Sequence, residues 1–188
     1  LICSINQYLL IDKPLIKINH LGDNKIKELY CEDLVKYLSP LKSNLDEKDQ
    51  NKLKRNPLRI LDSKNETTQN ILKDAPKINN YISNSSKMLL DEIIRTFSSE
   101  CSIQIDSSLV RGLDYYTGFV FEAISDDLGA QNAYLGGGRY DNLCSQLGGK
   151  NLPAIGMAIG LERLSILINA EEASNKLISF IILSEKIN

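Results

Sequence analysis

The sequence is poor in the residue types that build metal sites, disulfide frameworks and membrane spans. Its 188 residues include no tryptophan, one histidine and four cysteines, and no two cysteines form a Cys-x-x-Cys pair. A structural zinc site and a disulfide framework are therefore not expected. The longest apolar runs, such as residues 178–183, fall far short of the roughly 20 residues that a membrane helix needs. These absences exclude a transmembrane protein and indicate four reduced thiols in a cytoplasmic protein.

Excess charge of one sign is also lacking. The chain has 22 Lys and Arg against 24 Asp and Glu, for a formal net charge of −2. No general positive field attracts nucleic acid, although an enzyme with local contacts to RNA remains compatible with this composition. Hydrophobic residues make up 43% and charged residues 24% of the chain, as in an average folded domain. The length fits one domain, or one domain with a small insert.

Residue spacing predicts an α+β fold, with an antiparallel sheet, flanking helices and an inserted, mostly α-helical domain. Residues 15–21 alternate apolar and polar side chains, which is typical of a half-buried strand. Helical spacing of apolar residues follows, whereas nearly all glycine lies from Gly112 onward. The predicted helices are 26–38, 45–55, 66–73, 86–97, 140–147 and 161–168, and the further predicted strands are 119–124 and 154–160.

Both ends of the chain look cut. The sequence does not begin with Met, and residues 1–10 and 176–183 resemble strands without neighbours. We therefore expect a fragment of a longer protein. The predicted parts are strands of a catalytic core at 1–21, a helical insertion domain at 22–105, the rest of the core at 106–170, and a linker with the first strand of a further domain at 171–188.

The first chemically dense segment, residues 111–118, places an arginine, an aspartate and two tyrosines between glycines. The guanidinium of Arg111 offers a rigid fork of donors suited to phosphate oxygens. Tyr115 and Tyr116 offer flat faces and hydroxyls for a small aromatic or polar ligand. If both tyrosines lie on a strand, they point to opposite faces, so only one fully enters a given pocket. A tyrosine-rich hairpin with an Arg111–Asp114 ion pair is the alternative that needs no ligand.

Two further segments are rich in glycine. Residues 136–141 contain three consecutive glycines, which let the backbone approach a ligand or simply form a turn. Residues 156–164 predict a strand with room for a flat group, followed by Arg163 in the first turn of a helix, where an anion is favoured. Tight packing of strand on helix is the alternative there. Together the three segments describe a pocket with two phosphate-binding arginines, Arg111 and Arg163, and tyrosine walls.

These segments resemble the signatures of the histidyl-tRNA synthetases, a family of class II aminoacyl-tRNA synthetases, in both order and spacing. Residues 111–122 resemble the first histidine-specific signature, residues 137–143 the second, and residues 156–164 the third class II motif. Residues 56–64 are similar to a stretch of the family's insertion domain. The resemblance covers almost the whole chain and implies a ligase of protein biosynthesis built on a class II-type antiparallel sheet.

The resemblance also implies a reaction and a histidine site. The family activates histidine with ATP to histidyl-adenylate and transfers the histidyl group to tRNA(His). Arg111 would be the catalytic residue, with its fork bridging the α-phosphate and the histidine carboxylate. Tyr115, Tyr116 and Tyr140 would surround the imidazole. Tyr116 is the better candidate of the adjacent pair for direct contact.

For the ATP site the resemblance implies Gly160, against which adenine would lie flat, and Arg163, which would hold the γ-phosphate. Mg²⁺ would bridge the ATP phosphates mainly through ligands that this chain lacks, and no metal site is expected within it. The family's first and second class II motifs and its anticodon-binding domain are also missing. We therefore expect the fragment alone to be inactive and the full-length protein to be a cytoplasmic homodimer.

Two other functions fit parts of the chain. The catalytically silent paralogue that regulates ATP phosphoribosyltransferase in histidine biosynthesis shares the catalytic fold and a similar Tyr-Tyr segment. It lacks the helical insertion and part of the arginine set, so residues 59–64, Arg111 and Arg163 argue against it. The helical block could also be a non-catalytic clamp for a tRNA acceptor stem. Its nearly balanced charge makes it a weak nucleic-acid binder on its own.

Overall fold

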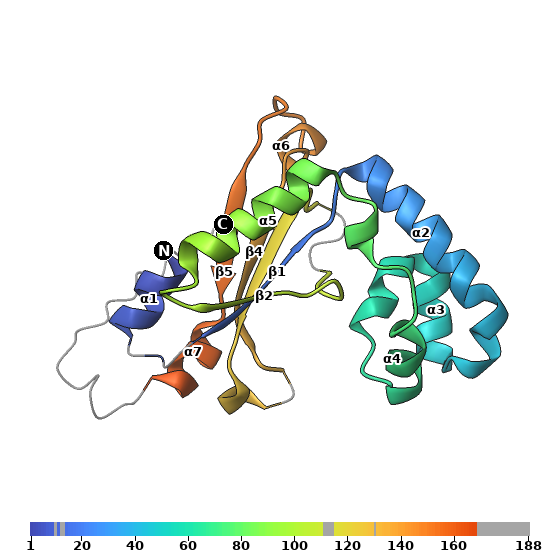
Figure 1. Cartoon of the computed structure of the whole chain (residues 1–188), viewed down its shortest axis with the longest axis horizontal. Helices are drawn as coiled ribbons and strands as arrows, with labels where there is room; N and C mark the ends of the chain where they lie inside the picture. The colour runs from blue at the N-terminus through green and yellow to red at the C-terminus, as the bar shows by residue number, and fades with distance from the viewer. Residues whose placement is uncertain (10, 12–13, 111–114, 130, 169–188) are drawn as a thin grey trace, which may run out of the picture.

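The computed structural model describes residues 1–9, 11, 14–110, 115–129 and 131–168, which form a five-stranded sheet with helices around it (Figure 1). The strands are β1 Leu15–His20, β2 Ser102–Ile105, β3 Phe119–Ile124, β4 Ala133–Arg139 and β5 Ile155–Ile159. The helices are α1 Ile2–Tyr8, α2 Asn24–Leu38, α3 Glu47–Arg55, α4 Glu66–Leu72, α5 Asn84–Phe97, α6 Leu143–Gln146 and α7 Leu161–Leu167. The 3-10 helices are η1 Ser39–Asn44, η2 Pro57–Asp62, η3 Ile78–Asn80 and η4 Asp126–Leu128.

The sheet has one apolar face, which helices cover. Its strand order is β2-β1-β3-β4-β5, with β1 parallel to β2 and all other neighbours antiparallel. Opposite residues on neighbouring strands share a face, so Ile18, Phe121 and Gly137 lie on the same side. Helix α5 packs on β1 and β2, and α1 and α7 add Cys3 and Leu164 to the same cluster. The α+β class is confirmed, and the β1–β2 pair makes the sheet mixed.

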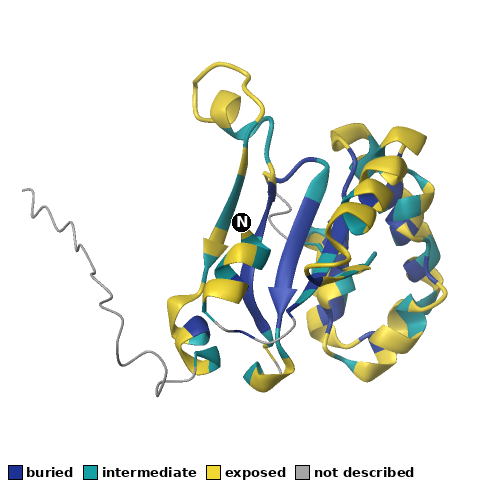
Figure 2. Ribbon diagram, turned by 60° about the vertical axis from the view of Figure 1, so that its left-hand side comes forward, coloured by how far each residue is buried: buried dark blue, intermediate teal, exposed yellow. Residues whose placement is uncertain are grey.

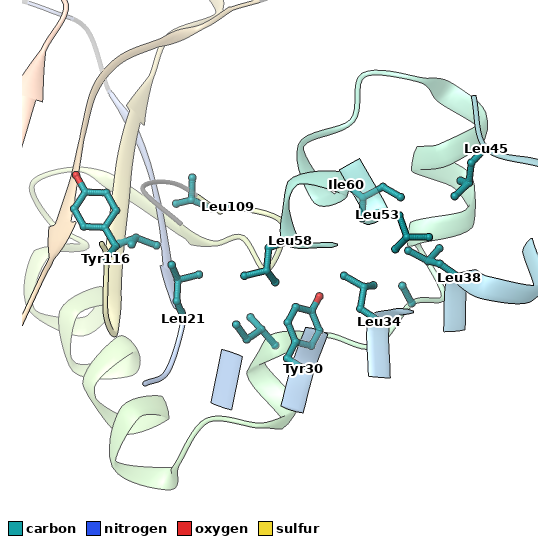
Figure 3. Packing of buried hydrophobic residues seen from close by; sticks show 13 residues of the cluster. Leu21, Tyr30, Leu34, Leu38, Leu45, Leu53, Leu58, Ile60, Leu109 and Tyr116 are labelled. Carbon is teal, nitrogen blue, oxygen red and sulfur yellow. The ribbon is translucent and has the colours of Figure 1, made fainter. Parts of the chain in front are cut away.

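A second apolar cluster joins the sheet to the helical module, which we define as α2, η1, α3, η2 and α4. Figure 3 shows this cluster running from Tyr116 beside the sheet, through Leu21 and Leu58, to Leu53 of α3 and Leu45. The inward faces of these helices are buried and their outer faces are exposed (Figure 2). The module therefore shares one continuous core with the residues around the sheet.

The elements predicted from the sequence at 15–124 and 154–168 are confirmed to within two residues at each end, whereas the helix predicted over 140–147 is limited to α6. The prediction of a strand over residues 1–10 is wrong, because residues 2–8 form helix α1. Ile2, Cys3, Ile5 and Asn6 are its less exposed positions, and that spacing matches one face of a helix. A short apolar stretch does not distinguish a strand from a buried helix by composition alone.

Two further segments differ from expectation. Residues 102–105, assigned from the sequence to the helical insertion, form β2 and pair with β1. Ile103 and Ile105 are half-buried while the alternate residues are exposed, which is the two-residue period of a strand. The glycines at 136–138 lie within β4 and not in a turn, because both neighbouring strands bond to them.

One buried carboxylate organises the end of the helical module. Asp49 of α3 is only 1% exposed. It accepts hydrogen bonds from Ser63 Oγ and from Thr68 Oγ1 (2.7 Å), and it pairs with Lys52 Nζ at 2.8 Å. Burial opposes ionisation of Asp49, but the donors from Lys52, Ser63 and Thr68 outweigh it, so its pKa lies below the ordinary value. These bonds fix the turn that carries Lys64.

We predict that Asp49→Asn lowers the free energy of unfolding by about 2–4 kcal/mol, because Lys52 loses its charge partner and a buried hydroxyl loses an acceptor. Urea unfolding at pH 7 measures the effect. Asp62→Asn is the matched control, because its carboxylate is 72% exposed and 3.6 Å from Lys64. That surface pair is expected to contribute less than about 1 kcal/mol. Equal losses in both variants would contradict the role given to Asp49.

A histidine supports the corner between β1 and α2. His20 Nδ1 accepts a hydrogen bond from the Gly22 N–H at 3.1 Å, which requires a ring nitrogen without a proton. Its Nε2 faces Gly118, where a Cβ would lie 3.3 Å away. Burial, and secondly the charge of Arg139, lower the pKa of His20 below 6.5. The fold therefore holds this imidazole neutral.

Because the folded pKa of His20 is depressed, its contribution to stability is complete above pH 6.5 and is lost as the pH falls through the folded pKa. We predict that the free energy of unfolding decreases from pH 7 towards pH 5, and that His20→Asn flattens this dependence. Asparagine offers Gly22 a similar acceptor without titrating. Asp49 and Asp106, with pKa values lowered from 3.8, do not titrate in this range. An unchanged slope in His20→Asn would contradict the assignment.

Candidate active site

The sheet face opposite the helices α1 and α5 carries few large side chains near β4 and β5. Register places Glu122, Gly136 and Ala158 across from one another on β3, β4 and β5. Val120, Gly138 and Gly156 lie two positions further along the same strands, so they are also opposite one another and on the same face. We call this surface the glycine face. Its glycines have no side chain, so a flat ring can lie close to the backbone at these positions.

The backbone at Thr117 and Gly118 holds a tyrosine-bearing segment over the glycine face. The Thr117 N–H donates to the Arg139 carbonyl oxygen at 2.7 Å, at the end of β4. The Gly118 N–H donates to the Gly22 oxygen at 2.8 Å, and the Leu21 N–H returns a 2.7 Å bond to the Gly118 oxygen. Gly118 has φ +75°, a conformation that favours glycine. The segment is therefore fixed between the ends of β1 and β4.

Three tyrosines meet beside this crossing. The ring centroids of Tyr115 and Tyr116 are 4.4 Å apart, and that of Tyr140 lies 6.3 Å from the first and 6.2 Å from the second. Tyr116 is 8% exposed and Tyr115 38% exposed. The premise that both lie on a strand is wrong, because Tyr115 is in a turn and Tyr116 precedes β3. The two adjacent rings consequently contact each other, with their planes tilted by 55°.

The tyrosines rest on positions where the sheet has glycine. A Cβ at Gly138 would lie 3.1 Å from Tyr116 Cδ1, and one at Gly156 would lie 2.5 Å from Tyr140 Oη. Lys27 Nζ of α2 donates to the Tyr116 carbonyl oxygen at 3.0 Å. Glycine at these two sheet positions thus makes room for the aromatic rings themselves.

A cavity of about 430 Å³, the aromatic cavity, lies next to the rings. Tyr115, Tyr116 and Gly160 line it together with Arg163. The Arg163 guanidinium reaches from the first turn of α7 to the start of β4, where Nη1 donates to the Ala133 oxygen at 2.5 Å. Nη2 donates to Gln131 Oε1 at 2.7 Å. A guanidinium has five N–H donors, so this anchored group keeps donors for a ligand oxygen.

A second cavity of about 620 Å³, the polar cavity, shares Arg163 with the first. Lys17, Asp106 and Glu122 line it from the sheet side and Lys64 from the helical module. Lys17 Nζ lies 2.8 Å from Asp106 Oδ2. Burial opposes ionisation of Asp106, but the bonds from Lys17 and Ser108 lower its pKa below the ordinary value. Arg163 thus stands between an aromatic and a charged compartment.

The residues predicted from the sequence are found close together where the structure describes them. Tyr115, Tyr116, Gly160 and Arg163 line one cavity, and Tyr140 completes the aromatic group. Arg111, the predicted catalytic residue, lies outside the described residues.

The segment that leads to Arg111 is nevertheless anchored. The buried side chain of Asn19 in β1 donates from Nδ2 to the Leu109 carbonyl oxygen at 3.1 Å. The Leu109 N–H bonds to the Asp106 oxygen at 3.0 Å. Residues 106–109 are therefore fixed against the sheet and against the wall of the polar cavity.

Sequence reasoning missed the charged lining of the polar cavity. Lys17 and Glu122 are opposite one another, and each stands between two apolar residues of its strand. A charge within such a strand is a signal that could have identified them, because buried charges need a partner or a ligand. Within the described part of the chain, no group of three or more His, Cys, Asp or Glu side chains is placed to hold a metal ion. No helix there is long and apolar enough to cross a bilayer.

Comparison with known proteins identifies the same family as the signatures. A sequence model of the histidyl-tRNA synthetases matches residues 16–164. A histidine–tRNA ligase of Wolbachia pipientis from Culex pipiens is 45% identical over 179 residues, covering 92% of this chain and 44% of the relative. One from Rippkaea orientalis is 48% identical, covering 84% of this chain and 37% of the relative. The chain thus spans less than half the length of these relatives.

A solved structure agrees with the sequence comparison. The apo histidyl-tRNA synthetase of S. aureus superimposes with a TM-score of 0.65 at 29% identity, covering 94% of this chain and 43% of that one. The match therefore includes both the sheet and the helical module. The family match across most of the chain and this common fold lead to one conclusion: the chain belongs to the histidyl-tRNA synthetase family.

Proposed function

We propose that this chain is part of a histidine–tRNA ligase, in which it supplies much of the site that activates histidine with ATP. The observation that carries the proposal is the convergence of three tyrosines and an anchored arginine on the glycine face. Family membership and relatives named histidine–tRNA ligase support it. The regulatory paralogue of histidine biosynthesis is not favoured by these relatives.

In the proposed histidine site, Tyr115 and Tyr116 wall the imidazole and Tyr140 closes the same pocket. The more buried position of Tyr116 supports it as the direct partner, since a buried hydroxyl discriminates between polar ligands more strongly than an exposed one. Aromatic faces and hydroxyls suit a flat, polar imidazole. Held between rings, histidine would present its carboxylate towards the phosphates.

In the proposed ATP site, Arg163 binds the γ-phosphate and Gly160 leaves space for adenine. The anchoring of Arg163 by Ala133 and Gln131 supports this role, because a pre-positioned guanidinium needs no rearrangement when charge arrives. Arg111 would bridge the α-phosphate and the histidine carboxylate, holding both in line for adenylate formation. Loss of pyrophosphate would then leave histidyl-adenylate for transfer to tRNA(His).

Magnesium would enter with ATP, bound to its phosphates and neutralising their charge. Among the described residues, no group of three or more His, Cys, Asp or Glu side chains is placed to hold a resident metal ion. We further propose that activity needs the parts of the relatives that this chain does not span, and that the fragment alone does not charge tRNA. The full-length protein would act as a cytoplasmic homodimer.

The full-length protein is expected to catalyse histidine-dependent exchange between pyrophosphate and ATP. In that protein, we predict that Tyr116→Phe weakens histidine binding about 5- to 30-fold, the effect of one buried hydrogen bond of roughly 1–2 kcal/mol. ATP binding should stay unchanged. Tyr115→Phe is the matched control and should have the smaller effect. Separate titrations with histidine and ATP test this. A stronger effect of Tyr115→Phe would reverse the assignment, and no exchange at all would contradict the proposed function.

A glycine pair distinguishes ligand contact from packing. At Gly160 a Cβ would meet its nearest neighbours, Arg163 Cδ and the Tyr134 oxygen, at an ordinary 3.7 Å, whereas at Gly156 it would collide with Tyr140. We therefore predict that Gly160→Ala weakens ATP binding at least about 10-fold, since a methyl group displaces a stacked ring, while leaving the melting temperature unchanged. Gly156→Ala should instead lower the melting temperature, as overpacking does. Unchanged ATP binding in folded Gly160→Ala would remove Gly160 from the site.

A further inference from the structure

Two cysteines that lie far apart in the sequence meet on the face of the sheet opposite the candidate site. Cys3 is in α1 and Cys101 directly precedes β2. Their Sγ atoms are 2.7 Å apart across 98 positions of sequence. Thiols at this distance need little movement to form a bond. We propose that Cys3 and Cys101 are a peroxide-sensitive pair that closes reversibly to a disulfide and fixes α1 to the sheet.

Both partners are held in place by the surrounding structure. The Tyr134 hydroxyl in β4 donates to Asn6 Oδ1 of α1 at 2.9 Å, so α1 is tied to the sheet one turn beyond Cys3. Cys101 is 7% exposed, and its thiol faces the Phe97 carbonyl oxygen at the end of α5, 3.7 Å away. The packing of α1, α5 and β2 in the folded chain therefore brings the two sulfur atoms together.

The two sulfur atoms have different surroundings. Burial, and secondly the bond with Cys3, raise the pKa of Cys101 to about 12, so it is a protonated thiol at neutral pH. Cys3 is only half-buried. Both line an apolar cavity of about 410 Å³ beside the sheet. Hydrogen peroxide is small and uncharged, and Cys3, the more exposed of the two thiols, is the sulfur that it reaches first.

The chemistry balances with one peroxide for two thiols. The Cys3 sulfur attacks one peroxide oxygen, the O–O bond breaks, and the released hydroxide leaves as water with the thiol proton. Cys3 is then a sulfenic acid. The Cys101 sulfur attacks the Cys3 sulfur, the S–S bond forms and the S–O bond breaks. The second hydroxide takes the Cys101 proton, so two thiols lose two electrons and peroxide becomes two waters. A dithiol reductant reverses the change.

The other cysteines provide matched controls. Cys144 is exposed and Cys31 is half-buried. Cys31 belongs to the cluster around the helical module, whereas Cys3 and Cys101 belong to the cluster on the apolar face. Cys144→Ser removes the exposed thiol that could link two molecules, so it is the background for the test.

The experiment treats the reduced 188-residue Cys144→Ser chain with hydrogen peroxide and measures intact mass, free thiols and linked peptides. We expect a loss of about 2 Da that dithiothreitol reverses. The free-thiol count should fall from three, the four cysteines less Cys144, to one. Peptides containing Cys3 and Cys101 should be linked. Adding Cys31→Ser should leave the mass loss intact, whereas adding Cys3→Ser should abolish it.

A second measurement tests whether the bond fits the fold. Since the bond closes a loop of about a hundred residues, the oxidised chain should melt roughly 5–15 °C above the reduced chain. A gain of about 32 Da without linkage, which marks sulfinic acid, would overturn the proposal. A link through Cys31, or a lower melting temperature after oxidation, would overturn it as well.

Discussion

The candidate site depends above all on one backbone crossing. The peptide groups of Thr117 and Gly118 bond on one side to the end of β4, at Arg139, and on the other to the corner after β1, at Leu21 and Gly22. These bonds decide where the tyrosine-bearing segment lies. They also join the first strand of the chain to a strand more than a hundred residues later. The helical module begins at the same corner, so the site and the module share one attachment point.

Much of the architecture followed from residue pattern, because amphipathic helices carry their signal within a few turns. Helices α2 and α5 and strand β3 were predicted this way. The three signature segments also predicted residues that the fold brings together, since Tyr115, Tyr116 and Arg163 line one cavity. Their spacing was enough to identify the family. None of this required knowledge of how distant segments meet.

What the sequence did not reveal depends on contacts between distant segments. The rings of Tyr115 and Tyr116 contact each other because Tyr115 lies in a turn and not in a strand. The polar cavity needs Lys17 beside Asp106, which only the sheet brings together. Local propensity cannot rank such alternatives, because their energies are set by the folded environment.

The cluster from Leu45 through Leu58 to Tyr116 also has a mechanical meaning. Closely packed side chains resist compression and transmit displacement over their whole length. Lys27 adds a direct bond from α2 to the backbone of Tyr116. A displacement at the outer end of the helical module would therefore be transmitted through these packed side chains, and through the Lys27 bond, to the segment that carries Tyr116.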